Sequence, residues 1–156
     1  MKVAYVVVSA APPALHVGTL IDSLHDSGWN VCLAATPTAA SWLDVGTLSR
    51  HAGNPLRHDF RAVEWPLADA IIAAPATFNT INKWAAGISD SFALGVLNES
   101  IGLGVRTVAC PYAKPTLAAH PAFGRSLRSL ESWGVEVLPN EAIRSSWTPV
   151  LEALDR

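Results

Sequence analysis

Charged residues are scarce in this sequence, and no stretch of it concentrates charge of one sign. Asp, Glu, Lys and Arg make up 15% of the 156 residues, the formal net charge is −2, and half of the residues are hydrophobic. No cluster of Lys and Arg is present, which disfavours nucleic acid and anionic membrane surfaces as partners. So apolar a chain is expected to cover part of its surface with another subunit, and we predict a homo-oligomer.

Long apolar runs are also missing. None reaches the roughly 18 residues that a bilayer-spanning helix needs, and the apolar run near the N-terminus is too short and too soon interrupted by prolines for a secretory signal. We therefore expect a cytoplasmic protein with no membrane segment. Only two cysteines occur, Cys32 and Cys110, without CxxC spacing. Neither a zinc site nor a disulfide framework is predicted, and both thiols are expected in the core.

Several motifs that carry chemistry in other enzymes are absent. The sequence has no GxGxxG fingerprint, no phosphate-cradling GxxxxGKS, no Ser-His-Asp grouping and no metal-ligand set. A dinucleotide site of the Rossmann type and a metal centre are therefore disfavoured. Any redox chemistry would depend on a bound organic cofactor.

What the sequence does contain is an alternation of short apolar strands with amphipathic helices. Strands are expected at 2–9, 30–35, 70–74, 105–110 and 135–138, with helices between them. The first helix would turn Leu15, Leu20, Ile21 and Leu24 inward. This order predicts an α/β fold, a Rossmann-like open parallel sheet with helices on both faces, formed by one domain over residues 1–156. Ligands of such a sheet bind beyond the carboxyl ends of its strands, where four loops, beginning at Ser9, Thr36, Pro75 and Pro111, would converge.

The stretch from Ala68 to Asp90 is the most informative. A strand without charges, 70–74, is followed by Pro75 and then by a helical pattern. One side of this helix would carry Phe78, Ile81, Ala85 and Ile88, and another face would carry Asn79, Asn82 and Lys83. Thr and Asn side chains and free backbone N–H groups at the start of this helix can hold an oxygen-rich ligand. The alternative is a capped helix after a core strand that binds nothing.

Two other features bear on a site. Hydroxyls in the loops, an amide in the 75–90 stretch and a spare tryptophan suit a mononucleotide such as FMN. The segment 49–64 has the least regular pattern and carries His58, which would act as a base near neutral pH or would be an exposed histidine without a task.

The residues Pro75–Asp90, PATFNTINKWAAGISD, resemble the PASANT motif and following helix of the homo-oligomeric flavin-containing cysteine decarboxylases. That family includes phosphopantothenoylcysteine decarboxylase and the peptidyl-cysteine decarboxylases of lantibiotic biosynthesis. Thr36–Trp42 is similar to its second flavin loop, and Pro111–Pro121, PYAKPTLAAHP, takes the place of its PxMNxxM substrate clamp. The resemblance covers most of the chain.

The resemblance implies an FMN cofactor at a subunit contact within a trimer, and trimers of the family sometimes assemble into dodecamers. By position, Ser9–Ala11 and Thr36–Thr38 would hold the phosphate and ribityl groups, Trp42 would flank the flavin, and Thr77–Thr80 would line its ring system. The residues assigned to the cofactor are Ser9, Ala10, Ala11, Thr36, Thr38, Trp42, Pro75, Thr77, Phe78, Asn79, Thr80 and Tyr112.

The catalytic part of the motif set departs from the family pattern. His58 is the nearest match to the family's base, but Asp59 follows it and it comes early in the sequence. Lys114 stands where the family has an asparagine that orients the substrate, and Leu117 replaces a methionine. A lysine can pair with a carboxylate but cannot accept a hydrogen bond, so an acidic substrate is expected without specificity for cysteine.

Three functions follow from this reading. The first is an FMN-dependent oxidoreductase or decarboxylase acting on a small or peptidyl carboxylic acid, with His58 as base and Lys114 as carboxylate anchor. The second is a non-catalytic flavin-binding or regulatory subunit that keeps only the FMN pocket. The third, a flavin-modifying transferase resembling the flavin prenyltransferases, is ranked last because the basic and glutamate residues expected after Asp90 are missing.

Overall fold

Five parallel strands form one sheet in the order β2-β1-β3-β4-β5. The structure is a computed structural model that describes residues 1–61 and 64–156. The strand β1 pairs in regular register with both neighbours, for example Ala4 with Val31 on one side and Ala4 with Ala70 on the other, whereas the register of the β3–β4 pair shifts between Ala73 and Ala76. The Rossmann-like α/β fold predicted from the sequence is confirmed. The strands are β1 (Lys2–Val8), β2 (Trp29–Ala35), β3 (Ala70–Ala76), β4 (Arg106–Pro111) and β5 (Glu136–Val137).

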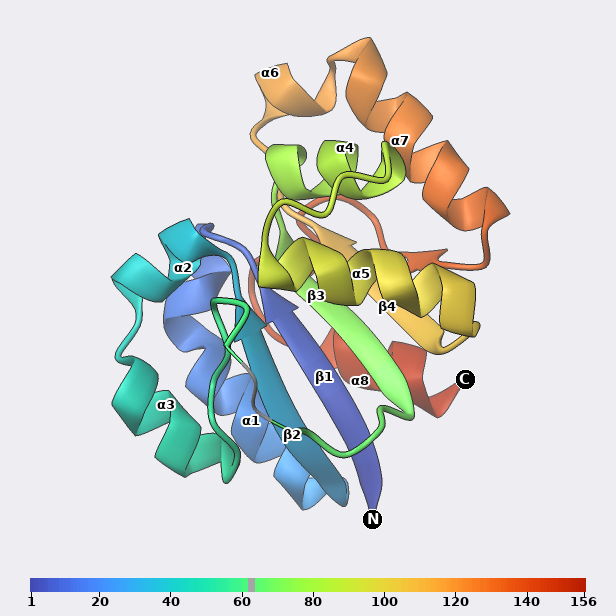
Figure 1. The fold of residues 1–156 in the computed structure, drawn as a ribbon. Helices are drawn as coiled ribbons and strands as arrows, with labels where there is room; N and C mark the ends of the chain where they lie inside the picture. Colours follow the sequence, from blue (N-terminus) through green and yellow to red (C-terminus); the bar gives the residue numbers. More distant parts are fainter. Residues whose placement is uncertain (62–63) are drawn as a thin grey trace.

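Helices cover both faces of this sheet (Figure 1). On one face α1 and α8 pack against Ala4, Val6 and Val8 of β1, and on the other α4, α5 and α7 pack with Val7 and Ile71. Successive residues of a strand point to opposite faces, so these uncharged strands are buried on both sides. The helical elements are η1 (Pro12–His16), α1 (Val17–Asp26), α2 (Pro37–Trp42), α3 (Val45–Ala52), α4 (Phe78–Ala85), α5 (Phe92–Leu103), α6 (Pro115–Ala118), α7 (Pro121–Ser132) and α8 (Thr148–Asp155).

Three local predictions were wrong. Leu15, expected inward, is 62% exposed, because it belongs to the short 3₁₀ helix η1 and not to α1. Ile88, expected on the buried side of the helix after β3, is exposed because α4 ends at Ala85. The irregular segment begins later than expected, since α3 extends to Ala52 and is capped by Asp44, whose carboxylate accepts a hydrogen bond from the Thr47 amide at 3.0 Å. Residues 62–63 of that segment lie outside the described residues.

Both cysteines lie in the core, as predicted. Burial raises the pKa of Cys110 to about 12 and that of Cys32 to about 11, from an ordinary value of 9.0. Among the described residues, no helix combines the length and the apolar composition that a membrane crossing requires.

We expect neither thiol to react with iodoacetamide at pH 8 in the folded protein, and both to react once it is unfolded, because the thiolate is the reactive form. The folded pKa values lie above the unfolded one, so the folding stability linked to these groups is complete below pH 9 and declines as the pH rises from 9 towards 12. Mass spectrometry of alkylated protein measures the first effect, and urea unfolding between pH 8 and 11 measures the second. Rapid native alkylation of Cys110 would contradict its placement.

Candidate functional site

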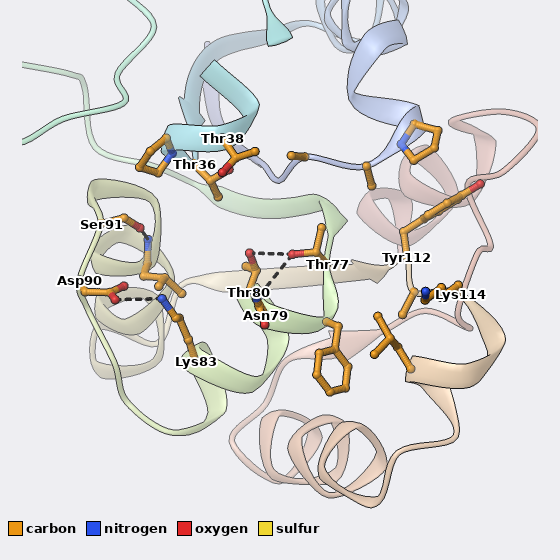
Figure 2. Close-up of a pocket in the computed structure, with 18 of the residues that line it drawn as sticks. Thr36, Thr38, Thr77, Asn79, Thr80, Lys83, Asp90, Ser91, Tyr112 and Lys114 are labelled. Carbon is orange, nitrogen blue, oxygen red and sulfur yellow. Dashed lines mark hydrogen bonds and ion pairs between the residues drawn. The ribbon is translucent and has the colours of Figure 1, made fainter. Parts of the chain in front are cut away.

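A cavity of about 770 Å³ opens where the carboxyl ends of the strands meet (Figure 2). Its wall comes from the loops that follow β1, β2, β3 and β4, from the start of α5 and from Glu141. The convergence of four loops at this edge was predicted from the strand order. The lining residues are Ala10, Ala11, Pro12, Thr36, Pro37, Thr38, Thr77, Phe78, Asn79, Thr80, Lys83, Asp90, Ser91, Leu94, Tyr112, Ala113, Lys114, Leu117 and Glu141.

Three hydroxyl groups form a connected network at the back of the cavity. Ser9 Oγ donates to Thr80 Oγ1 at 2.9 Å, and Thr77 Oγ1 donates to the same oxygen at 3.2 Å. The Ser9 amide also donates to the Pro75 carbonyl at 3.0 Å, so the end of β1 is tied to the end of β3. Because Thr80 Oγ1 accepts both hydrogen bonds, its own proton remains for an acceptor in the cavity.

The start of α4 presents polar groups to the cavity. Thr77 is the N-cap, with extended backbone angles, and its Oγ1 accepts a hydrogen bond from the Thr80 amide at 3.3 Å. The Asn79 side chain is exposed, and no residue that the structure describes hydrogen-bonds to its amide. The backbone amides of the first helical turn have no intrahelical acceptor, so this end of α4 can receive an oxygen-rich or anionic group.

The loop after β2 supplies the opposite wall (Figure 2). Thr36 caps α2 by accepting a hydrogen bond from the Ala39 amide at 3.2 Å, and its own amide donates to the Val8 carbonyl at 3.0 Å. The second bond holds the β2 loop against the end of β1. Thr38, in the first turn of α2, is exposed to the cavity.

The loop after β4 is held rigidly by the segment that follows β5. The Ala113 amide donates to the Asn140 side-chain oxygen at 2.9 Å, and the Asn140 side-chain nitrogen donates back to the Ala113 carbonyl at 2.8 Å. Glu141 donates its amide to the Pro111 carbonyl at 2.9 Å. These bonds fix the backbone on either side of Tyr112 and Lys114, both of which line the cavity.

Two lysines of the cavity differ in their surroundings. Lys83 Nζ lies 2.9 Å from Asp90 Oδ2, an ion pair between α4 and the residue just before α5 (Figure 2). Lys114 is exposed, and within the described parts of the chain no carboxylate lies at ion-pair distance from it. The charge of Lys114 is thus free to meet an anionic ligand, whereas that of Lys83 is already compensated.

Most residues that the sequence analysis singled out are brought together here. Ser9 lies behind the cavity wall and reaches it through Thr80, and Pro75 lies within β3, where its peptide bond with Ala74 is cis. The following singled-out residues line the cavity: Ala10, Ala11, Thr36, Thr38, Thr77, Phe78, Asn79, Thr80, Tyr112 and Lys114.

Trp42 and His58 are not among the residues that line the cavity of their own chain. Trp42 is the last residue of α2 and is 48% exposed. Because an α-helix rises about 1.5 Å per residue, Trp42 lies roughly 7.5 Å along the helix axis from Pro37, which does line the cavity. His58 follows Arg57, which exchanges backbone hydrogen bonds with Leu33 and Ala35 of β2 at 2.9 Å. Because β2 is the edge strand on that side, this pairing sets the backbone of residue 57 at the edge of the sheet, and the Arg57 guanidinium carbon lies 3.9 Å from the centre of the Phe92 ring at the start of α5.

Nine lining residues were not among the assigned cofactor-binding or catalytic residues: Pro12, Pro37, Lys83, Asp90, Ser91, Leu94, Ala113, Leu117 and Glu141. Lys83 was predicted to share one helix face with Asn79 and Asn82. Lys83 and Asn79 do line the cavity, whereas the Asn82 side chain accepts a hydrogen bond from Ser126 of α7 at 2.8 Å. The Asp-Ser pair before a helix was a detectable capping signal, and Ser91 caps α5. Glu141 had no detectable signal, because only the packing of the chain after β5 places it here.

Structures of known proteins share this fold. The FMN-dependent cysteine decarboxylase TvaF from thioviridamide biosynthesis has a TM-score of 0.83 and 21% identity, covering 100% of this chain and 99% of its own. The epidermin biosynthesis protein EpiD from Staphylococcus aureus has a TM-score of 0.79 and 21% identity over 88% of this chain and 82% of its own. The FMN binding protein AtHal3 has a TM-score of 0.75 and 19% identity over 92% of this chain and 83% of its own.

Sequence comparison with curated proteins finds no significant match. The family model described as Flavoprotein matches residues 2–154, which is nearly the whole chain and includes every loop of the cavity. The chain belongs to the Flavoprotein family.

Proposed function

We propose that the cavity at the carboxyl ends of the strands binds FMN. The observation that carries this proposal is the meeting of three features around one space: the Thr36–Thr38 loop, the Ser9–Thr77–Thr80 hydroxyl network, and the Asn79 amide, which has no hydrogen-bond partner among residues 1–61 and 64–156. A volume of about 770 Å³ lies within the range of ligand pockets, roughly 300–1,000 Å³. Family membership and the FMN-dependent neighbours support the same cofactor.

The residues present fit a flavin mononucleotide in their chemistry. Hydroxyl and backbone N–H groups of 10–12 and 36–38 suit the phosphate and ribityl chain, and Asn79 suits the polar edge of the ring system. Phe78, Tyr112 and Leu117 provide apolar surface on the other side. Bound FMN would supply a two-electron acceptor, which none of the twenty side chains provides.

The proposed reaction is decarboxylase-like, on a small or peptidyl carboxylic acid. Lys114, exposed at the mouth and free of carboxylate partners among residues 1–61 and 64–156, would anchor the substrate carboxylate. The clamping of Ala113 by Asn140 holds the Lys114 backbone in place, so positioning costs little conformational entropy. His58 does not line the cavity of its own chain, so as a base it would act on the cavity of a neighbouring subunit.

A second candidate function is flavin binding without catalysis. No histidine lines the cavity within the described part of the chain, and Lys114 and Leu117 depart from the family's clamp. One structural neighbour is described only as an FMN binding protein. In this case the chain would keep the cofactor pocket and serve as a flavin-binding or regulatory subunit.

Purified protein is expected to be yellow and to quench the fluorescence of added FMN on binding. In an anaerobic screen of thiol-bearing and other carboxylic acids, bleaching of the flavin absorbance with release of carbon dioxide identifies a decarboxylase. Tight FMN binding without bleaching by any acid supports the second candidate. Protein that is colourless and leaves FMN fluorescence unchanged contradicts both.

We also propose that the chain forms a homo-oligomer, as a trimer or a dodecamer. Large apolar side chains are exposed on the segment between α3 and β3 and at the end of α5: Phe60 is 67%, Leu67 91% and Leu103 72% exposed. Such surface is unfavourable in water unless another subunit covers it. Light scattering coupled to size-exclusion chromatography measures the mass, and a monomer of 16.5 kDa would contradict the proposal.

A further inference from the structure

A second cavity, of about 370 Å³, adjoins the first. It lies between η1 and α1 on one side and the segment 143–147 on the other, and it shares Pro12 and Tyr112 with the first cavity. Tyr112 follows β4 and is the residue next to Ala113, which Asn140 holds in place. Both cavities therefore border Pro12 and Tyr112.

The wall of this second cavity is preformed. Trp147 is only 8% exposed, and its indole N–H is shared between the His16 carbonyl at 3.2 Å and Thr19 Oγ1 at 2.9 Å. These bonds join the segment before α8 to η1 and α1. A pocket whose wall is already ordered loses little conformational entropy when a ligand enters it.

The groups at the rim of the second cavity suit an anion. Arg144 lines it, and none of its lining residues is Asp or Glu. Glu141 lies 3.7 Å from one terminal nitrogen of Arg144, but it lines the first cavity, and the Arg144 side chain remains 71% exposed. A guanidinium carries five N–H donors, so most of them stay available.

Two serine hydroxyls add further donors. Ser146 Oγ accepts a hydrogen bond from the Thr148 amide at 3.4 Å, which leaves its own proton to donate. Ser145 is exposed, and its hydroxyl has no hydrogen-bond partner within the described ranges. Arginine with neighbouring hydroxyls is a common arrangement for recognising a carboxylate or a phosphate.

We propose that the second cavity is a subsite for an anionic group, a carboxylate or a phosphate, at the far end of an elongated substrate. This inference rests on the proposed function, because it assumes that the reacting end of the substrate lies in the first cavity beside Lys114. Arg144 is then a specificity-determining residue. It selects substrates that carry a second negative charge remote from the reacting carboxylate.

The main test uses FMN-loaded protein and peptides that end in cysteine, with glutamate, phosphoserine or glutamine placed one to four residues before it. Calorimetry on protein whose FMN has been reduced with dithionite and kept anaerobic measures binding without turnover, because reduced flavin cannot accept electrons from the peptide. At one spacing an acidic peptide is expected to bind about tenfold more tightly than its glutamine counterpart, and Arg144→Gln should abolish that preference. The glutamate and phosphoserine peptides distinguish a carboxylate from a phosphate ligand.

The matched control is Arg125→Gln, an exposed arginine of α7 on the opposite face of the sheet, which should retain the preference. A second measurement needs neither substrate nor cofactor: inorganic phosphate should shift the amide signals of Ser145 and Ser146 and the indole signal of Trp147, and Arg144→Gln should prevent this. If FMN is not retained but phosphate still shifts these signals, the subsite stands and the proposed function fails. If FMN is retained and neither acidic peptides nor phosphate respond to Arg144, the subsite is refuted.

Discussion

Asn79→Asp is expected to weaken FMN binding by about 10- to 100-fold without lowering the stability of the fold. The substitution keeps the shape of the side chain but removes its two N–H donors and adds a negative charge at the cavity wall. The cofactor loses a hydrogen-bond donor, and its acceptor atom then faces a carboxylate, which is also an acceptor. This costs about 1.5–3 kcal/mol of binding free energy, which corresponds to the 10- to 100-fold loss of affinity. Quenching of FMN fluorescence measures it.

The folding stability of the Asn79→Asp variant should stay the same or rise slightly. A loss of FMN affinity in this variant can therefore not be explained by unfolding. Position 79 is in the first turn of α4, two residues after the N-cap Thr77. A carboxylate there interacts favourably with the helix dipole, by about 0.3–1 kcal/mol. The apoprotein of Asn79→Asp should therefore unfold at the same or a slightly higher temperature than the parent.

Ala122→Asp is the matched control for this variant. Ala122 holds the equivalent position of α7, two residues after the N-cap His120, and it does not line the cavity. It should gain the same helix-dipole interaction and bind FMN as the parent does. Equal loss of FMN in Asn79→Asp and Ala122→Asp would show that charge alone, and not contact with the cofactor, weakens binding.

Lys114→Ala is expected to leave FMN affinity within about twofold of the parent and to lower kcat/KM for an acidic substrate by about 10- to 100-fold. Lys114 makes no side-chain capping bond to α6, so its removal should not disturb the loop that Asn140 holds. A lost charge-assisted hydrogen bond to the substrate carboxylate corresponds to about 1.5–3 kcal/mol. The rate of anaerobic flavin bleaching by the most reactive acid of the screen measures it.

Lys114→Arg keeps a positive charge and should recover part of this loss, whereas Lys114→Met, which keeps most of the length without the charge, should not. Loss of FMN from Lys114→Ala as severe as that from Asn79→Asp would undo the division of the cavity into a cofactor part and a substrate part. A rate unchanged by Lys114→Ala would mean that the carboxylate is anchored elsewhere.

The order of the elements could be predicted from local patterns. Uncharged strands such as 70–76, buried on both faces, require a parallel sheet between two helical layers. That sheet in turn places its binding edge at the strand carboxyl ends, which is why the loops beginning at Thr36, Pro75 and Pro111 were expected to converge, and residues of all three loops do line one cavity. Local patterns did not predict the helix at 45–52. Its Gly, Ser and His residues have weak helix propensity, and this outweighed the capping signal of Asp44 at its start.

The sequence by itself thus determined the sheet, its two helical layers, and the loops that meet at one edge, because hydrophobic period and capping act over a few residues. Only the tertiary structure decided which side chains of those loops face inward. Trp42 at the end of α2 is exposed, and the backbone hydrogen bonds of Arg57 to β2 set His58 next to the edge strand. Glu141 and Arg144 reached the two cavities because Asn140 binds Ala113, a contact between residues far apart in the sequence that no local pattern encodes.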